Sequence, residues 1–205
     1  MSFYADHIFP YLLDWATKPL APQRQHTIGL ARGKVLEIGV GTGANLPFYS
    51  AEVESVVGIE PDTAMLDKAK AFLAKNPVKV AVDLQIGDAH QLIFPNGSFD
   101  TAIMCLVLCT IPDPERAMRE AWRVLKPGGK VIFLEHVRAS TPRLAKAQDW
   151  LTPMWKHLGC GCHLNRDTER VISNAGFRFE QIERYMHPDM PPLGGAIIEG
   201  VAVKA

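Results

Sequence analysis

Three glycines at alternate positions, directly after an apolar run, constrain the fold of this chain more than any other feature. They lie in the stretch from Val35 to Asn45, whose first residues are typical of a buried parallel strand. Glycines placed in this way allow a tight turn and let the backbone approach a ligand closely. A helix over 44–49 would point its amide groups into the same crevice. The stretch therefore predicts a strand, a loop and a helix that together bind a nucleoside.

Strand-like and helix-like segments alternate along the following hundred residues. We expect strands over 35–40, 56–60, 80–87, 99–108 and 130–137, and helices over 63–75 and 114–125. Pro127-Gly128-Gly129 is expected to form a sharp stop before the last of these strands. Such alternation implies parallel strands joined by right-handed crossovers.

The C-terminal part departs from this alternation. A helix over 168–175 is followed by two strands, 177–185 and 196–204, with a Pro/Gly-rich loop and no helix between them. Strands joined in this way are expected to be antiparallel. We therefore predict an α/β fold with a seven-stranded, mostly parallel sheet, an antiparallel C-terminal edge strand and helices on both faces.

The length of 205 residues fits one domain with a well-buried core. Within residues 1–205, we expect the ligand-binding core over 35–137, and a C-terminal helix and strand pair over 168–205. Residues 1–34 would form a helical cap, and residues 138–167 an insertion that shapes the substrate pocket. The aromatic residues among the first 20 positions fit a lid over the ligand or, alternatively, an amphipathic segment that contacts a membrane surface.

Charge and composition argue against several classes of function. The 22 basic and 22 acidic residues give a formal net charge of zero, so nucleic acid is not the expected partner. No secretory signal is visible, and no run reaches the roughly 18 apolar residues that span a bilayer. The four cysteines are expected to be the reduced thiols of a cytoplasmic protein. Cys109 and the run Cys160-Gly161-Cys162-His163, with His157, lack the paired spacing of structural zinc sites, so no metal site is expected.

Two motifs leave the class of nucleoside open. Gly39-x-Gly41-x-x-Ala44 satisfies a dinucleotide-binding pattern, and Glu60 ends the second strand at the spacing of a ribose-binding carboxylate. Both features fit more than one adenosine-containing cofactor. Gly87-Asp88-Ala89, at the end of the third strand, suits hydrogen bonding to an adenine amino group.

Taken in order from residue 35 to about 136, five motifs resemble the class I S-adenosylmethionine-dependent methyltransferases, of the group that includes the ubiquinone/menaquinone C-methyltransferases. They are the glycine loop, Glu60, Gly87-Asp88-Ala89, the segment from Phe94-Pro95 to Phe99-Asp100, and Leu125-Lys126-Pro127-Gly128-Gly129. Further segments resemble the methyltransferase-like thiol S-methyltransferases: Leu106-Val107-Leu108-Cys109, Glu135-His136-Val137, and Gly161-Cys162 with Leu164 and Arg166. The resemblance implies a Rossmann-like methyltransferase fold and S-adenosylmethionine as the cofactor.

The resemblance also implies roles for individual residues. The first strand and its loop would lie under the methionine and ribose, Glu60 would bind the ribose hydroxyls, and the end of the fourth strand would lie beside the transferring methyl group. The expected cofactor-binding residues are Glu37, Gly39, Gly41, Gly43, Asn45, Glu60, Pro61, Met65, Gly87, Asp88, Ala89, Cys105, Leu106 and Val107.

His136 is the expected catalytic residue, because it follows the fifth strand at the edge where such folds place their sites. The sulfonium is already an activated electrophile, so the protein mainly has to align the acceptor with the methyl group. The resemblance favours a small-molecule thiol as the acceptor, followed by an amine or amino-lipid and a quinol-like compound. The alternatives are a nicotinamide-dependent oxidoreductase and a non-catalytic cofactor-binding protein.

Overall fold

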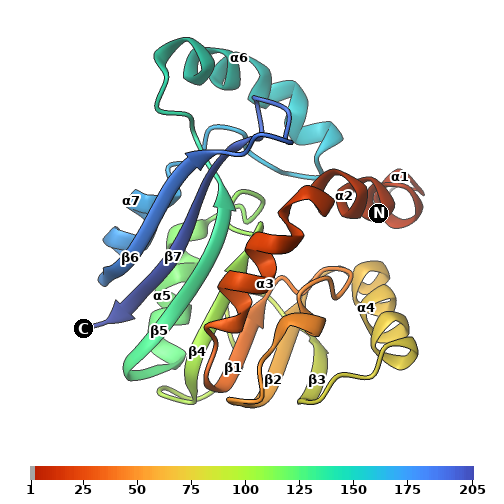
Figure 1. Ribbon diagram of the computed structural model, residues 1–205, viewed down its shortest axis with the longest axis vertical. Helices are drawn as coiled ribbons and strands as arrows, with labels where there is room; N and C mark the ends of the chain where they lie inside the picture. Colours follow the sequence, from red (N-terminus) through yellow and green to blue (C-terminus); the bar gives the residue numbers. More distant parts are fainter. Residues whose placement is uncertain (1–2) are drawn as a thin grey trace.

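A seven-stranded sheet runs through the centre of the molecule, in the order β3-β2-β1-β4-β5-β7-β6 (Figure 1). The computed structural model describes residues 3–205 apart from the side chain of Asp6, so the first two residues of the predicted cap lie outside the described residues. Strands β1 to β5 pair in parallel, whereas β7 runs antiparallel to both of its neighbours, β5 and β6. The strands are β1 (Gly33–Ile38), β2 (Val53–Glu60), β3 (Ala81–Ile86), β4 (Phe99–Cys105), β5 (Leu125–His136), β6 (Phe177–Met186) and β7 (Ala196–Lys204).

The predicted fold is confirmed, including the antiparallel pair of C-terminal strands. Within that pair, β7 lies between β5 and β6, so that β6 forms the outer edge of the sheet. The chain leaves β1 toward β2 and β3 on one side and returns to β4 and β5 on the other. The carboxyl ends of β1 and β4 therefore flank the switch point, which is where open α/β sheets bind ligands.

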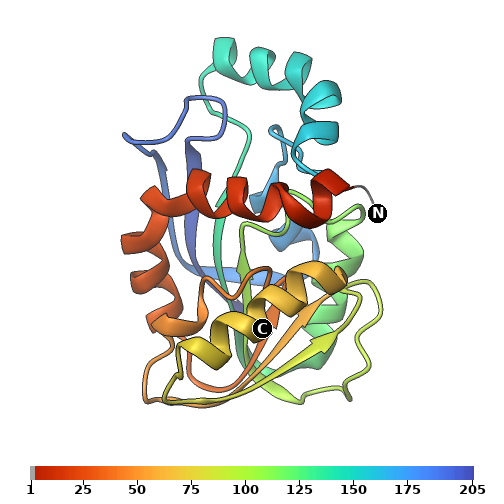
Figure 2. The same cartoon turned by 90° about the vertical axis from the view of Figure 1, so that its right-hand side faces the viewer.

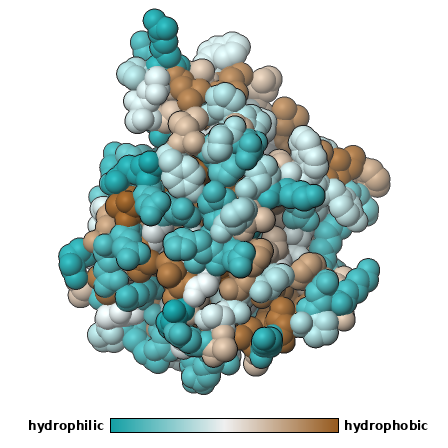
Figure 3. Space-filling view, viewed as in Figure 1, coloured by the Kyte–Doolittle hydropathy of each residue, from teal (hydrophilic) through white to brown (hydrophobic). Residues whose placement is uncertain are grey.

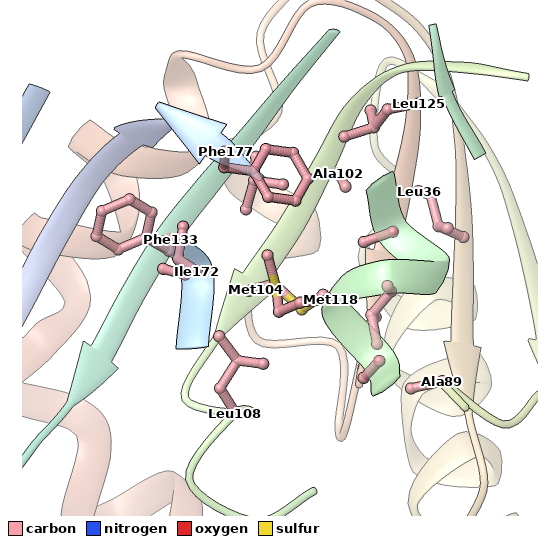
Figure 4. Close-up of a cluster of buried hydrophobic side chains, with 14 of the residues drawn as sticks. Leu36, Ala89, Ala102, Met104, Leu108, Met118, Leu125, Phe133, Ile172 and Phe177 are labelled. Carbon is pink, nitrogen blue, oxygen red and sulfur yellow. The ribbon is translucent and has the colours of Figure 1, made fainter. Parts of the chain in front are cut away.

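Helices cover both faces of this sheet (Figures 1 and 2). Side chains of α5 and α7, among them Met118 and Ile172, pack with Phe133 on one face (Figure 4). On the other face, side chains of α3 and α4, among them Ile28 and Leu66, form a second buried cluster with β1 and β2. The helices are α1 (Phe3–His7), α2 (Phe9–Thr17), α3 (Ala21–Gly29), α4 (Thr63–Lys75), α5 (Pro114–Val124), α6 (Pro142–Leu158) and α7 (Thr168–Asn174), with short 3₁₀ turns η1 (Lys18–Leu20) and η2 (Leu46–Phe48).

The helix predicted over 44–49 is wrong, because this region is only the single 3₁₀ turn η2. Pro47 lies inside the turn, and proline disfavours the helical conformation of the residue before it. Tyr49 is then extended, with ψ at 129°. No α-helix therefore begins after the glycine loop, and helix-terminal amide groups do not point into the crevice there.

The fourth and fifth strands also differ from prediction. β4 ends at Cys105 rather than at residue 108, because Leu106 takes a left-handed φ of 55° that a strand does not accommodate. Pro127-Gly128-Gly129 does not stop the chain before β5 but lies within it, where the pairing with β4 shifts register. Gly128 supplies the positive φ of 73° that this irregularity needs.

Two aspartates begin the helices that follow β2 and β4. The Asp62 carboxylate accepts hydrogen bonds from the amides of Ala64 and Met65 at the start of α4. Asp113 accepts from the Arg116 amide, and Pro114 occupies the first turn of α5. Both are favourable N-terminal caps, which fix where the loops at the carboxyl edge of the sheet end.

Helices α1, α2 and α6 lie beyond the carboxyl edge of the sheet (Figures 1 and 2). The Tyr4 hydroxyl donates to the carbonyl of Leu158 at 2.8 Å, which joins α1 to the end of α6. The Thr42 hydroxyl donates to Asp14 at 2.7 Å, which joins α2 to the glycine loop. Among the described residues, none of the helices combines the length and hydrophobicity needed to traverse a bilayer.

Candidate functional site

The glycine loop ties the carboxyl ends of β1 and β2 together. The amide of Gly39 donates to the carbonyl of Ile59 at 2.9 Å. The amide of Gly41 donates to Oε2 of Glu60 at 3.0 Å, and the Asp62 amide donates to its Oε1 at 3.3 Å. Burial raises the pKa of Glu60, while the two amide hydrogen bonds oppose that rise. The Glu60 carboxylate is therefore fixed in place, at the end of β2 and against the loop.

The loop needs its glycines for two physical reasons. Gly39, Gly41 and Gly43 have φ values of 74°, 57° and 87°, a conformation that residues with a Cβ rarely adopt. A Cβ on Gly39 would also collide with the side chain of Val107, which follows β4. A Cβ on Gly41 would lie 3.8 Å from the terminal methyl of Met65. The glycines thus let the ends of β1 and β4 and the start of α4 converge.

Glu37 lies below this loop and is closed off from solvent. It is 1% exposed, and its carboxylate accepts hydrogen bonds from the side-chain amide Nδ2 of Asn45 and from the Tyr49 hydroxyl, both at 2.7 Å. Burial raises its pKa to about 7, although both hydrogen bonds lower it. Glu37 therefore shapes the loop from beneath through Asn45 and Tyr49.

Arg24, a residue that the sequence analysis did not single out, connects the cap to this network. From α3 its Nη1 donates to Oδ1 of Asn45 at 2.6 Å and to the sulfur of Cys105 at 3.3 Å. Arg24 is only 8% exposed, and Cys105 is also buried, which raises the pKa of that thiol to about 11. Arg24 lies in the polar run Pro22-Gln23-Arg24-Gln25-His26, which carries no sequence signal that it would be buried.

The predicted adenine-binding residues lie together at the ends of β2 and β3. Gly87, Asp88 and Ile59 line a small pocket with residues 91–94. Oδ1 of Asp88 accepts a hydrogen bond from the His90 amide at 2.9 Å, which lowers the pKa of this exposed carboxyl. Ala89, the next residue, is buried. Pro61 follows Glu60, and Met65 lies in the first turn of α4.

A buried glutamate holds the end of β4 in place. Oε1 of Glu135 accepts from the amides of Val107 and Leu108, at 2.8 and 3.0 Å. Burial raises the pKa of Glu135, which is 0% exposed. Leu106 takes its left-handed φ here, and the side chain of Val107 lies against Gly39 across the switch point between β1 and β4. Such backbone strain is often found where a loop is held for function.

His136 lies at the end of β5 and contacts a thiol. Its Nε2 is 3.0 Å from the sulfur of Cys162. Burial alone would lower the pKa of His136, but Cys162 and Glu135 outweigh that effect and raise it. The hydrogen bond to Cys109 and burial both raise the pKa of the Cys162 thiol. His136, the predicted catalytic residue, therefore contacts the sulfur of Cys162, and the sequence does not reveal this contact.

The segment after α6 brings Cys162 to this position. The amide of His163 donates to the carbonyl of Cys109 at 2.9 Å, which clamps the segment against the loop that follows β4. Arg166 extends the clamp, since its Nη2 donates to the carbonyl of Ile111 at 2.9 Å. The carboxyl ends of β4 and β5 are thus lined by sulfur, imidazole and one guanidinium group.

Comparisons with known proteins agree with this arrangement. Residues 36–133 match the family model described as a methyltransferase domain. The human protein thiol S-methyltransferase TMT1B is 38% identical over 85% of this chain and 72% of its own. Phosphatidylethanolamine N-methyltransferase of Cereibacter sphaeroides is 34% identical over 74% of this chain and 72% of its own.

Solved structures of methyltransferases share the fold. An S-adenosylmethionine-dependent methyltransferase from Mesorhizobium loti superimposes with a TM-score of 0.66 at 20% identity, covering 90% of this chain and 97% of its own. The comparisons decide between the two cofactor classes that the glycine loop left open, and they favour the methyl donor over a nicotinamide. With the glycine loop, Glu60 and the methyltransferase fold in place, this chain belongs to the class I S-adenosylmethionine-dependent methyltransferases.

Proposed function

We propose that this enzyme transfers the methyl group of S-adenosylmethionine to the sulfur of a small-molecule thiol. The observation that carries the proposal is the 38% identity, over 85% of the chain, to a protein named as a thiol S-methyltransferase. The chemistry at the ends of β4 and β5 supports it, because the sulfur-bearing side chains and the guanidinium group there suit a soft, anionic acceptor.

The residues of the glycine loop fit the methyl donor. Glu60 keeps acceptor capacity on both carboxylate oxygens beyond the amides of Gly41 and Asp62, which suits the two ribose hydroxyls. Asp88 lines the small pocket at the ends of β2 and β3, and its Oδ1 is held by the His90 amide. Its Oδ2 is then suited to accept a hydrogen bond from the adenine amino group. When bound, the cofactor supplies an electrophilic methyl group. The protein's part is to hold donor and acceptor in line.

Deprotonation is the main chemical requirement for a thiol acceptor. The thiolate is the nucleophile, and nearby positive charge favours it. Arg166, which is half-buried near Cys109 and Cys162, supplies such charge at this end of the site. A thiol therefore needs less from the protein than an amine, which must be neutral, or a carbon acid, which needs a strong base.

An acceptor panel tests the proposal. Formation of S-adenosylhomocysteine would be measured with a small alkyl thiol, phosphatidylethanolamine in vesicles and a demethylated quinol as acceptors. We expect the thiol to give at least tenfold higher kcat/KM than the other two. Higher kcat/KM with the amine or the quinol would overturn the thiol assignment while leaving the methyltransferase family unchanged.

An amino-lipid is the second candidate acceptor, and two observations favour it. The chain is 34% identical to the phosphatidylethanolamine N-methyltransferase. Phe3, Tyr11 and Trp15 of the N-terminal helices are 67–75% exposed, and hydrophobic residues reach the surface over α1 and α2 (Figure 3). Such side chains suit peripheral contact of residues 1–20 with a membrane surface. Co-sedimentation with anionic vesicles, for the whole chain and for a Y11S/W15S variant, tests this contact.

None of the four cysteines is in a disulfide bond, which fits a reducing compartment, and we propose that the reaction takes place in the cytoplasm. A lid role for the N-terminal helices is compatible with this location, because Asp14 of α2 already contacts Thr42 of the glycine loop. Nucleic acid is not a proposed partner, since the net charge is zero.

A further inference from the structure

Three side chains with soft ligand atoms meet at the carboxyl ends of β4 and β5. Cys109 lies in the loop after β4, His136 ends β5, and Cys162 lies between α6 and α7. One sulfur, one imidazole nitrogen and the second sulfur all lie within 4.8 Å of one another. The sequence spacing of Cys109, His157, Cys160, Cys162 and His163 predicts no metal site. The cluster in the structure differs from that set, because it includes His136 and leaves out His157, Cys160 and His163.

The spacing of these atoms fits a tetrahedral metal ion. With zinc–sulfur bonds of about 2.3 Å and zinc–nitrogen bonds of about 2.0–2.1 Å, two ligands of one ion lie about 3.6–3.8 Å apart. The measured contact between Nε2 of His136 and the sulfur of Cys162 is 3.0 Å. This distance is less than 1 Å shorter than the separation of two ligands of one ion, and all three ligand atoms lie within 4.8 Å of one another.

The surrounding backbone holds the two thiols in place without a metal. His163 is bonded to Cys109 through both its amide, at 2.9 Å, and its Nδ1, at 3.2 Å from the same carbonyl. Gly161 next to Cys162 has a φ of 97°, which lets the chain turn sharply there. Ligands fixed in this way lose little freedom on binding an ion.

The orientation of the His136 ring also suits a metal. Nε2 lies 3.0 Å from the sulfur of Cys162 and is therefore the ring nitrogen that faces the cluster, while Nδ1 is enclosed on the other side of the ring. A neutral imidazole that binds through Nε2 carries its proton on Nδ1. The half-buried guanidinium of Arg166 adds a positive charge beside the cluster, although burial lowers its pKa.

We propose that Cys109, His136 and Cys162 bind a thiophilic divalent cation of the zinc class, with three protein ligands and one open position. Three protein ligands with a fourth position left open are typical of reactive rather than structural zinc sites. Two thiolates neutralise the ion, so the charge of Arg166 favours an anionic fourth ligand, for which a small thiolate is the best match. The metal site stands independently, and only the thiolate in the fourth position rests on the proposed function.

Metal binding is tested on the untagged full chain. The purified protein is depleted with a chelator and titrated with Zn²⁺ in competition with a chromophoric chelator. We expect about one equivalent to bind, with affinity falling about a hundredfold or more in C109S and in C162S. C160S is the matched control and should bind as the wild type does. Equal binding by the wild type and the C109S/C162S double variant would overturn the site.

Two further measurements keep the test decisive. Calorimetric binding of S-adenosylmethionine to C109S/C162S shows whether the variant is folded; the single variants replace it if it is not. The competing role is that of a redox pair, in which Cys109 and Cys162 form a disulfide. Thiol titration after exposure to oxidised glutathione examines it. A Cys109–Cys162 disulfide that forms readily, without any Zn²⁺ binding, would overturn the metal proposal.

The open position is tested with cobalt. The Co²⁺-loaded protein should gain sulfur-to-metal charge-transfer absorption when 2-mercaptoethanol is added, and C160S should behave in the same way. An unchanged spectrum would overturn the thiolate as fourth ligand. Stoichiometric Zn²⁺ binding by a protein that methylates only amines or quinols would keep the metal site and overturn the proposed acceptor, so the two failures are distinguishable.

Discussion

The two halves of the carboxyl edge of this sheet are built from different chemistry. At β1 and β2, the backbone amides of the glycine loop and the carboxylate of Glu60 form the site. At β4 and β5, sulfur, imidazole and a guanidinium group take their place. The first half is the proposed binding site for the adenosyl group of the methyl donor, and the second half is the proposed binding site for the acceptor.

The difference shows how one fold separates donor binding from acceptor choice. The donor half depends on neighbouring elements in the sequence, β1 to α4, whose geometry is set by glycines and caps. The acceptor half is assembled from the loop after β4, the end of β5 and the segment after α6. Changes in the second half can therefore alter the acceptor without disturbing the cofactor.

The largest effect expected in the donor half concerns Glu37 and pH. Burial raises its pKa from 4.5 to about 7, so the folded protein keeps a proton that the unfolded chain releases between these values. The stability contributed by this group is full below pH 4.5 and is lost as the pH rises through about 7. In urea denaturation, the unfolding free energy of the wild type relative to E37Q should fall by about 2–3 kcal/mol across this range. If the unfolding free energies of the wild type and E37Q change with pH in parallel, folding does not raise the pKa of Glu37.

Glu60 should have the next largest effect, and on cofactor binding. E60Q removes the charge that strengthens hydrogen bonds to the ribose hydroxyls, so affinity for S-adenosylmethionine should fall about tenfold to a hundredfold, or roughly 1.4–2.7 kcal/mol. Turnover at saturating cofactor should change little. E54Q, on the exposed part of the same strand, is the control for isothermal titration calorimetry. Unchanged affinity in E60Q would remove Glu60 from the cofactor site.

Gly39 tests whether the two halves must be in close contact. G39A places a Cβ against the side chain of Val107 and in a left-handed conformation, which should destabilise the protein by about 2 kcal/mol. It should also weaken cofactor binding, because Val107 and the loop must separate. Thermal denaturation measures the first effect. The control is G29A, where the added Cβ has no neighbour within 4 Å, and a loss of stability as large as in G39A would contradict this account.

The donor half could be predicted from the sequence because its signals are local. Glycine spacing, the strand-ending Glu60 and the Asp62 cap each depend on a few adjacent residues. The helix over 44–49 was wrong because Pro47 and the hydrogen bond from Tyr49 to Glu37 outweigh its helical pattern. The effect of Pro47 is local, whereas the hydrogen bond from Tyr49 depends on the folded strand β1, which a local pattern does not describe.

The contacts within the acceptor half and the burial of Arg24 could not be predicted, for the opposite reason. Arg24 lies in a polar run that is typical of an exposed helix, and only its contacts with Asn45 and Cys105 explain its burial. Cys109, His136 and Cys162 belong to three separated segments. Their meeting depends on the backbone bonds between His163 and Cys109, for which the sequence offers no periodic signal.

The smallest effect concerns the contact between the cap and the donor half. D14A removes the acceptor for the Thr42 hydroxyl, an exposed hydrogen bond worth about 0.5–1 kcal/mol, so α2 should separate from the glycine loop more often. If α2 acts as a lid, the cofactor should dissociate about twofold to fivefold faster in stopped-flow experiments, and equilibrium affinity should fall by a similar factor. D67A, which alters an exposed carboxylate on α4 instead, should leave both values unchanged. Identical dissociation rates for D14A and the wild type would mean that α2 covers the loop without retaining the cofactor. Contact of residues 1–20 with a membrane surface would then be the better explanation of their exposed aromatic side chains.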